Sequence, residues 1–173
     1  MDRFAFDQHI NIGNNANEII EQMIDGVSNF NDELVNPEEL EDWVARKISG
    51  VDPERDIEEY ELVHRLDNLC RMYKEYVKFK STIDAMDFDD LIVKSYKLLS
   101  DSGYTHILHG IQKKFRHILV DEFQDNNFAQ FSLVEKIAKD GNITAVGDPD
   151  QNIYRFQGAY TQIFEHFRKA FPK

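Results

Sequence analysis

Residues 117–151 read HILVDEFQDNNFAQFSLVEKIAKDGNITAVGDPDQ. An apolar, β-branched run over 117–120 opens this segment, a second apolar run follows over 143–147, and apolar side chains recur at helical spacing between them. Strand, helix and strand within about 30 residues predict a βαβ unit, whose strands are parallel and joined by a right-handed crossover. Because the first run is continuously apolar and β-branched, we expect its strand to be buried on both faces of the sheet.

Helical patterns occupy most of the chain before this unit. Apolar residues recur every three or four positions in five stretches, namely 18–30, 38–48, 54–80, 88–99 and 104–114. Asn36, followed by Pro37, and Asp87 are typical N-caps for two of these helices. Residues 1–17 show no sustained period and predict an arm or loop. The fold class is therefore α/β, with a mostly α-helical region followed by a partial parallel sheet.

Composition excludes few classes of protein. The chain has 173 residues, of which 42% are hydrophobic, and this supports a packed core. Its net charge of −12 comes from the first third, because residues 1–60 hold 16 of the 32 acids and only 4 of the 20 Lys and Arg. The rest of the chain is balanced and can still present a basic face to nucleic acid.

The sequence contains no run of about 18 uncharged apolar residues, and its first residues do not resemble a secretory signal. A single cysteine, Cys70, cannot form an internal disulfide. We therefore expect a cytoplasmic protein without a membrane partner.

Acidic side chains follow both predicted strands. Asp121 and Glu122 come directly after the first strand, and residues 147–151 follow the second. The carboxyl ends of parallel strands meet at one edge of a sheet, where ligands of α/β proteins bind. One carboxylate there can hold Mg²⁺, and its neighbour can activate a water molecule. The simpler alternative is that these charges only solvate the ends of the strands.

Three segments resemble motifs of the UvrD/Rep-like superfamily 1 helicases, in the family's order. Residues 118–125, ILVDEFQD, resemble the Walker B segment, and residues 146–159, VGDPDQNIYRFQGA, resemble motif III. Residues 86–92, MDFDDLI, resemble the segment that precedes Walker B. The resemblance implies an ATP-dependent DNA helicase or translocase, with a helical insertion over 18–114 and a partial RecA-like motor domain over 115–173.

The resemblance also implies roles for residues near the nucleotide. Asp121 would coordinate Mg²⁺ and Glu122 would be the catalytic base for ATP hydrolysis. Gln151 would sense the γ-phosphate and couple hydrolysis to movement on DNA. Gln124 and Asp148 would complete the contacts with the nucleotide. The cofactors of the complete protein would therefore be ATP and Mg²⁺.

A second group of residues would contact DNA. It comprises Tyr154, Arg155, Phe156 and Gln157. An aromatic ring that stacks on a base suits a motor that ignores sequence, because every base has a π-face. Gln157 stands where the family usually has Arg, so any contact with phosphate there is neutral. The expected partners are single-stranded and duplex DNA.

The phosphate-binding loop Gly-x-x-x-x-Gly-Lys-Ser/Thr does not occur in the sequence, and neither do the family's C-terminal motifs. We therefore expect an internal part of a larger motor, with the remaining helicase domains as partners. We also expect the isolated chain to hydrolyse no ATP. The strands would lack sheet neighbours, and their open edges favour self-association.

Two other functions fit parts of the sequence. The first is a non-catalytic regulatory module that binds DNA or protein, with the acidic site vestigial. Its basic side chains would be Lys74, Lys78, Lys80, Lys113, Lys114 and Arg116. The second is a metal-dependent phosphoesterase with two metal ions. Its ligands would be Asp121, Glu122, Asp125, Asp148 and Asp150.

Overall fold

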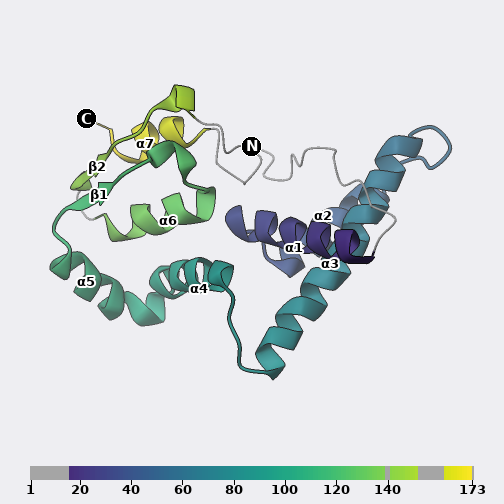
Figure 1. The fold of residues 1–173 in the computed structure, drawn as a ribbon, viewed down its shortest axis with the longest axis horizontal. Coiled ribbons are helices and arrows are strands. Elements are labelled where there is room, and N and C mark those ends of the chain that lie inside the picture. Colours follow the sequence, from purple (N-terminus) through teal and green to yellow (C-terminus); the bar gives the residue numbers. More distant parts are fainter. Residues whose placement is uncertain (1–15, 139–140, 152–161, 173) are drawn as a thin grey trace. The chain divides into compact units, whose positions relative to one another are not determined.

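The computed structural model describes residues 16–138, 141–151 and 162–172 of the chain (Figure 1). The described residues form two compact units, which we treat separately. The first unit holds residues 16–31 and 35–86, and the second holds residues 32–34 and 87–172. None of the helices in these ranges is long and apolar enough to cross a membrane.

The first unit is built from three helices, α1 (Ala16–Asp32), α2 (Pro37–Ile48) and α3 (Ile57–Thr82). The last residue of α1, Asp32, belongs to the second unit. Helix α2 begins where the sequence predicts. The Asn36 side chain accepts a hydrogen bond from the Glu39 N–H at 2.9 Å, and the Glu39 carboxylate accepts one from the Asn36 N–H at 3.2 Å. This capping box satisfies two amides that a helix start otherwise leaves unpaired.

The core of the first unit combines apolar residues from all three helices. Its buried members are Val27, Phe30, Val35, Leu40, Val44, Val63, Leu66, Leu69, Cys70 and Tyr73. The Tyr73 hydroxyl donates a hydrogen bond to Asn31 Oδ1 at 2.6 Å, which satisfies the polar end of an otherwise apolar side chain. Cys70 is buried, and burial raises the pKa of its thiol.

The described residues of the second unit form four further helices, two short strands and three 3₁₀ turns. In chain order they are α4 (Phe88–Ser100), η1 (Ser102–Tyr104), α5 (Thr105–Lys114), β1 (Ile118–Val120), η2 (Phe123–Asp125), α6 (Phe128–Ile137), β2 (Ile143–Ala145), η4 (Pro149–Gln151) and α7 (Ile163–Ala170). Asp87 caps α4 through a second capping box, with Asp90 as its partner. The helix start predicted there is confirmed.

Strands β1 and β2 pair in parallel, with Ile118 opposite Ile143 and Val120 opposite Ala145 (Figure 1). The βαβ unit is therefore confirmed. Val120 and Ala145 pack against a cluster formed by the buried side chains Phe123, Phe131 and Ile163. This cluster draws on η2, α6 and α7 and holds the sheet on the two helices.

The prediction that both faces of the first strand are buried is wrong. Leu119, in the middle of β1, is 75% exposed, and Thr144 opposite it is also exposed. Alternate residues of a strand point to opposite faces, and the described helices pack on the face that carries Val120. Within the described residues, β1 is therefore covered on one face only, although its sequence is apolar throughout.

Apart from residues 32–34, the second unit begins at Asp87, whereas the family resemblance implies a motor region that begins at residue 115. Helix α4 packs on α5 and α6, so it is part of the second unit. The functional regions 1–17, 18–114 and 115–173 stay a prediction, because compact packing and function need not share a boundary.

Candidate active site

The loops that follow β1 and β2 lie against each other, because the strands are parallel and in register. The Val146 N–H donates a hydrogen bond to the Val120 carbonyl at 2.8 Å, which continues the ladder beyond the strands. The Phe123 N–H then donates to the Val146 carbonyl at 2.9 Å. The acidic loop after β1 and the polar loop after β2 therefore share one edge of the sheet, as the parallel arrangement predicts.

Glu122 has a left-handed backbone, with φ 46° and ψ 47°. This conformation is uncommon for a residue with a side chain and is typical of functional sites held by their surroundings. Here it turns the chain sharply from the end of β1 into η2. The Asp121 carboxylate accepts a hydrogen bond from the Glu122 N–H at 3.0 Å. Asp121 and Glu122 are both exposed, so their carboxylates are accessible to a ligand.

Gln124 is the buried polar side chain of the site, with 2% of its surface exposed. Its Nε2 donates a hydrogen bond to Glu122 Oε2 at 2.7 Å. Its Oε1 accepts a hydrogen bond from the Asp148 N–H at 3.0 Å. The family resemblance implies that Gln124 contacts the nucleotide, whereas both polar atoms of its amide are bonded within the protein.

Gly147 makes room for this amide. A Cβ atom added at Gly147 would lie 2.5 Å from Gln124 Oε1 and 2.9 Å from the Phe123 nitrogen. Both distances are far below van der Waals contact, so a larger side chain would displace the Gln124 amide or the chain beside it. The requirement for glycine here is close approach between the two loops, a reason that the sequence alone does not reveal.

Asp148 is half-buried and ordered by its own loop. Its Oδ1 accepts a hydrogen bond from the Asp150 N–H at 3.0 Å, which shapes the turn that leads into η4. Gln151 ends η4, and its side chain lies outside the described residues. The four residues expected to contact DNA, 154–157, also lie outside the described residues.

The carboxylates at the strand ends fit a hard cation that keeps most of its water. Mg²⁺ in nucleotide sites takes one or two protein carboxylates, and Asp121 offers one at the surface. Within the described ranges, no three His, Cys, Asp or Glu side chains come together as a metal site. A phosphoesterase site with two metal ions therefore gains no support from the described part of the chain.

The basic side chains of α3 are engaged within the first unit. Lys74 forms an ion pair with Glu41, and the hydrogen bond to this carboxylate raises the pKa of Lys74. Lys78 lies 3.6 Å from Glu75. Lys80 is buried, with its ammonium 4.5 Å from the centroid of the Tyr76 ring, so it does not present the exposed charge that a DNA-binding module would use.

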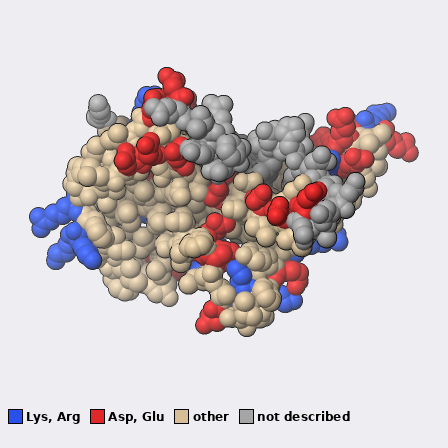
Figure 2. Space-filling model, in the orientation of Figure 1, with Lys and Arg blue, Asp and Glu red and all other residues tan. Residues whose placement is uncertain are grey.

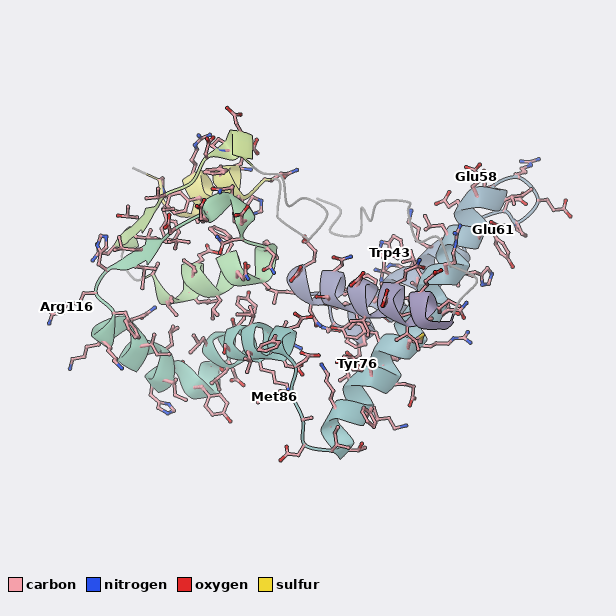
Figure 3. The ribbon with its side chains drawn as sticks, viewed as in Figure 1. Trp43, Glu58, Glu61, Tyr76, Met86 and Arg116 are labelled. Carbon is pink, nitrogen blue, oxygen red and sulfur yellow. The ribbon has the colours of Figure 1, made fainter. Side chains whose placement is uncertain are left out.

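The charges at the ends of the two units differ. Figure 2 shows Lys and Arg atoms gathered where α5 ends, and Figure 3 places Arg116 there, pointing away from the helices. Lys113 and Lys114, in the last turn of α5, are also exposed. Glu58 and Glu61 lie at the start of α3 (Figure 3), where the acidic first third of the chain ends. In the described residues, nothing besides its charge indicates that either group binds a ligand.

Comparison with known proteins places these features in a family. The family model described as UvrD/REP helicase N-terminal domain matches residues 2–172. The ATP-dependent DNA helicase UvrD1 of Mycobacterium tuberculosis is 32% identical over 162 residues, covering 87% of this chain and 18% of that protein. The UvrD1 of Mycobacterium leprae is 32% identical over 161 residues, covering 87% of this chain and 19% of that protein.

The ATP-dependent DNA helicase PcrA of Staphylococcus aureus is 40% identical over 106 residues, covering 61% of this chain and 14% of that protein. The chain thus spans less than a fifth of the length of these relatives.

Proposed function

The chain belongs to the UvrD/REP helicase N-terminal domain family, and on this premise we propose that it is part of an ATP-dependent DNA helicase. The motor would couple ATP hydrolysis to movement on single-stranded DNA and to unwinding of duplex DNA. One observation carries the proposal. The acid pair after β1 and the polar loop after β2 are held together at one edge of the sheet by the buried Gln124.

Within this function Asp121 would hold Mg²⁺, and Glu122 would take a proton from the attacking water. When bound, Mg²⁺ would neutralise charge on the phosphates that react. The exposed position of both carboxylates and the left-handed turn at Glu122 support these roles. Gln151 would sense the γ-phosphate, because the loop that carries it begins beside Gln124.

The segment 154–157 would supply the DNA contacts, with Phe156 as the residue that stacks on a base. Stacking contributes about 1–3 kcal/mol per base and tolerates any sequence. Gln157, in place of the usual Arg, would contact the strand through neutral hydrogen bonds. The expected partners are single-stranded and duplex DNA.

The rest of a larger motor would complete the sheet and the nucleotide site. No phosphate-binding loop occurs in this sequence, so the chain cannot cradle the phosphates by itself. Among the described residues β1 and β2 pair only with each other, so their outer edges and the exposed Leu119 leave surface that further strands or helices of a motor would cover. In isolation the same surface would favour self-association, which sedimentation at increasing concentration would detect.

The proposal is tested by two ATPase measurements. The chain alone should release no phosphate above background. When the chain is extended to include a phosphate-binding loop and the rest of a motor, it should hydrolyse ATP, with stimulation by single-stranded DNA. Glu122→Gln should then lower turnover at least about 100-fold, because it removes the general base.

The matched control is Glu135→Gln, the same substitution at an exposed carboxylate of α6, which should leave turnover unchanged. Turnover that survives Glu122→Gln in the extended protein would contradict the proposal. Strong turnover by the 173-residue chain alone, if lost in Glu122→Gln, would contradict the part that requires a phosphate-binding loop.

A further inference from the structure

The amide of Gln124 joins two elements that are distant in sequence. The side chain is almost fully buried, so water does not compete for its polar atoms. One end meets the Glu122 carboxylate on the loop after β1, and the other meets the main chain of Asp148 on the loop after β2. The Glu122 side chain is thereby tied to the main chain of the second loop.

The direction of this amide is determined by its partners. A carboxylate only accepts hydrogen bonds and a main-chain N–H only donates one, so Nε2 must face Glu122 and Oε1 must face Asp148. Rotation of the amide by half a turn would oppose two oxygens at one end and two donors at the other. A side chain at this position therefore needs one donor and one acceptor at its tip. Asparagine has both but is one methylene shorter.

The surroundings hold the amide in place. Phe123, beside it in the chain, is 1% exposed and anchors η2 in the cluster with Phe131 and Ile163. On the opposite side Gly147 lies so close that a Cβ atom would overlap Gln124 Oε1. A buried, doubly bonded amide with so little room has few other rotamers available.

We propose that Gln124 is a positioning residue, which orients the Glu122 carboxylate and makes it follow the loop over residues 147–150. The inference rests on the proposed function, since it is Glu122 that would act as the base. It differs from the contact with nucleotide that the family resemblance implies for Gln124. A displacement of the 147–150 loop, whatever its source, would change the position of the Glu122 carboxylate.

The bond between the loops is tested by amide hydrogen exchange in the 173-residue chain. Gln124→Met keeps the side-chain volume and removes both hydrogen bonds, so exchange of the Asp148 amide should accelerate about tenfold. The amides of Phe123 and Val146 are internal controls, because they bond to main-chain carbonyls instead. Gln112→Met is the matched control variant, since it removes one glutamine hydrogen bond, to the Lys136 carbonyl, in the same unit. An unchanged exchange rate at Asp148 would overturn the inference.

A measurement on the unmutated chain covers the case in which Gln124→Met does not fold. The Gln124 side-chain amide protons should exchange at least about tenfold more slowly than those of an exposed glutamine, because Nε2 is buried and bonded. Glu122→Ala should remove part of that protection and leave exchange at Gln112 unchanged. Free exchange of the Gln124 side chain in the unmutated protein would refute the inference without any variant.

A kinetic measurement separates positioning from nucleotide contact. In the extended protein, Gln124→Met should lower kcat for ATP about tenfold and leave KM within about twofold. The substitution disturbs the orientation of the base, and it removes no bond to the substrate. A rise in KM at unchanged kcat would overturn positioning in favour of contact. Failure of the proposed function is a separate result, since Glu122→Gln would then leave turnover intact while the exchange measurements stand.

Discussion

Asp32 offers the sharpest test of the electrostatics of the second unit. It is the last residue of α1, and its Oδ1 accepts a hydrogen bond from Asn127 Nδ2 at the start of α6. Burial is the largest cause that raises the pKa of Asp32 from 3.8 to about 7, and the nearby carboxylates of Asp89 and Glu33 contribute to the same rise. The folded protein therefore holds a proton on Asp32 at pH values where the unfolded chain has lost it.

The sign of the pH dependence follows from this difference. A carboxyl group whose pKa is higher in the folded state contributes its full stabilisation below the unfolded value, about pH 4, and loses it as the pH rises towards 7. The rise to about 7 corresponds to at most about 4 kcal/mol of folding free energy. Since solvent reaches part of the side chain, we expect about 2 kcal/mol.

The substitution Asp32→Asn isolates this effect. The new amide oxygen can still accept the hydrogen bond from Asn127, but it carries no charge and needs no proton. The variant should be more stable than the parent by about 2 kcal/mol near pH 8 and equally stable near pH 4. Urea denaturation followed by far-UV circular dichroism across this range measures the difference.

Asp25→Asn is the matched control, because it removes an exposed carboxylate from the same helix. Its effect should stay within about 0.5 kcal/mol at every pH. The reasoning would be refuted if Asp32→Asn were less stable than the parent near pH 8. It would equally be refuted if the difference between the two proteins did not grow as the pH rises from about 4 to about 7.

Three further substitutions test the packing and the helix starts. Gly147→Ala should destabilise the second unit by about 1–3 kcal/mol in urea denaturation, because its Cβ would overlap the Gln124 amide. It should also speed hydrogen exchange of the Asp148 amide. Unchanged stability would contradict the close approach of the two loops. Tyr73→Phe should lower the free energy of unfolding by about 1 kcal/mol, since a buried hydrogen bond is lost. Asp87→Ala should cost about 1 kcal/mol in thermal denaturation through loss of the α4 capping box, and no change would count against the cap.

The local features of the fold could be predicted because they depend on neighbours in the sequence. The caps at Asn36 and Asp87 are bonds between residues three apart. The helices follow from apolar residues repeated every three or four positions, and the βαβ unit from two apolar runs that flank such a repeat. Parallel pairing of β1 and β2 then brings the acid pair of Asp121 and Glu122 beside the loop after β2.

The sequence could not predict which groups these elements would bring into contact. The exposure of Leu119 depends on which face of the sheet the helices cover. An apolar run has the same sequence pattern whether one face or both faces are covered. The inward direction of Gln124 and the need for glycine at position 147 arise only when two loops approach within hydrogen-bond distance.

Periodicity and capping act over a few residues, so a linear sequence displays them directly. Asp32 and Asn127, by contrast, are 95 positions apart, and nothing near either residue indicates the other. Burial and the nearby carboxylates determine the proton on Asp32, and the hydrogen-bond partners on two loops determine the direction of the Gln124 amide. These surroundings exist only after the chain has folded, and for that reason tertiary structure alone decides both.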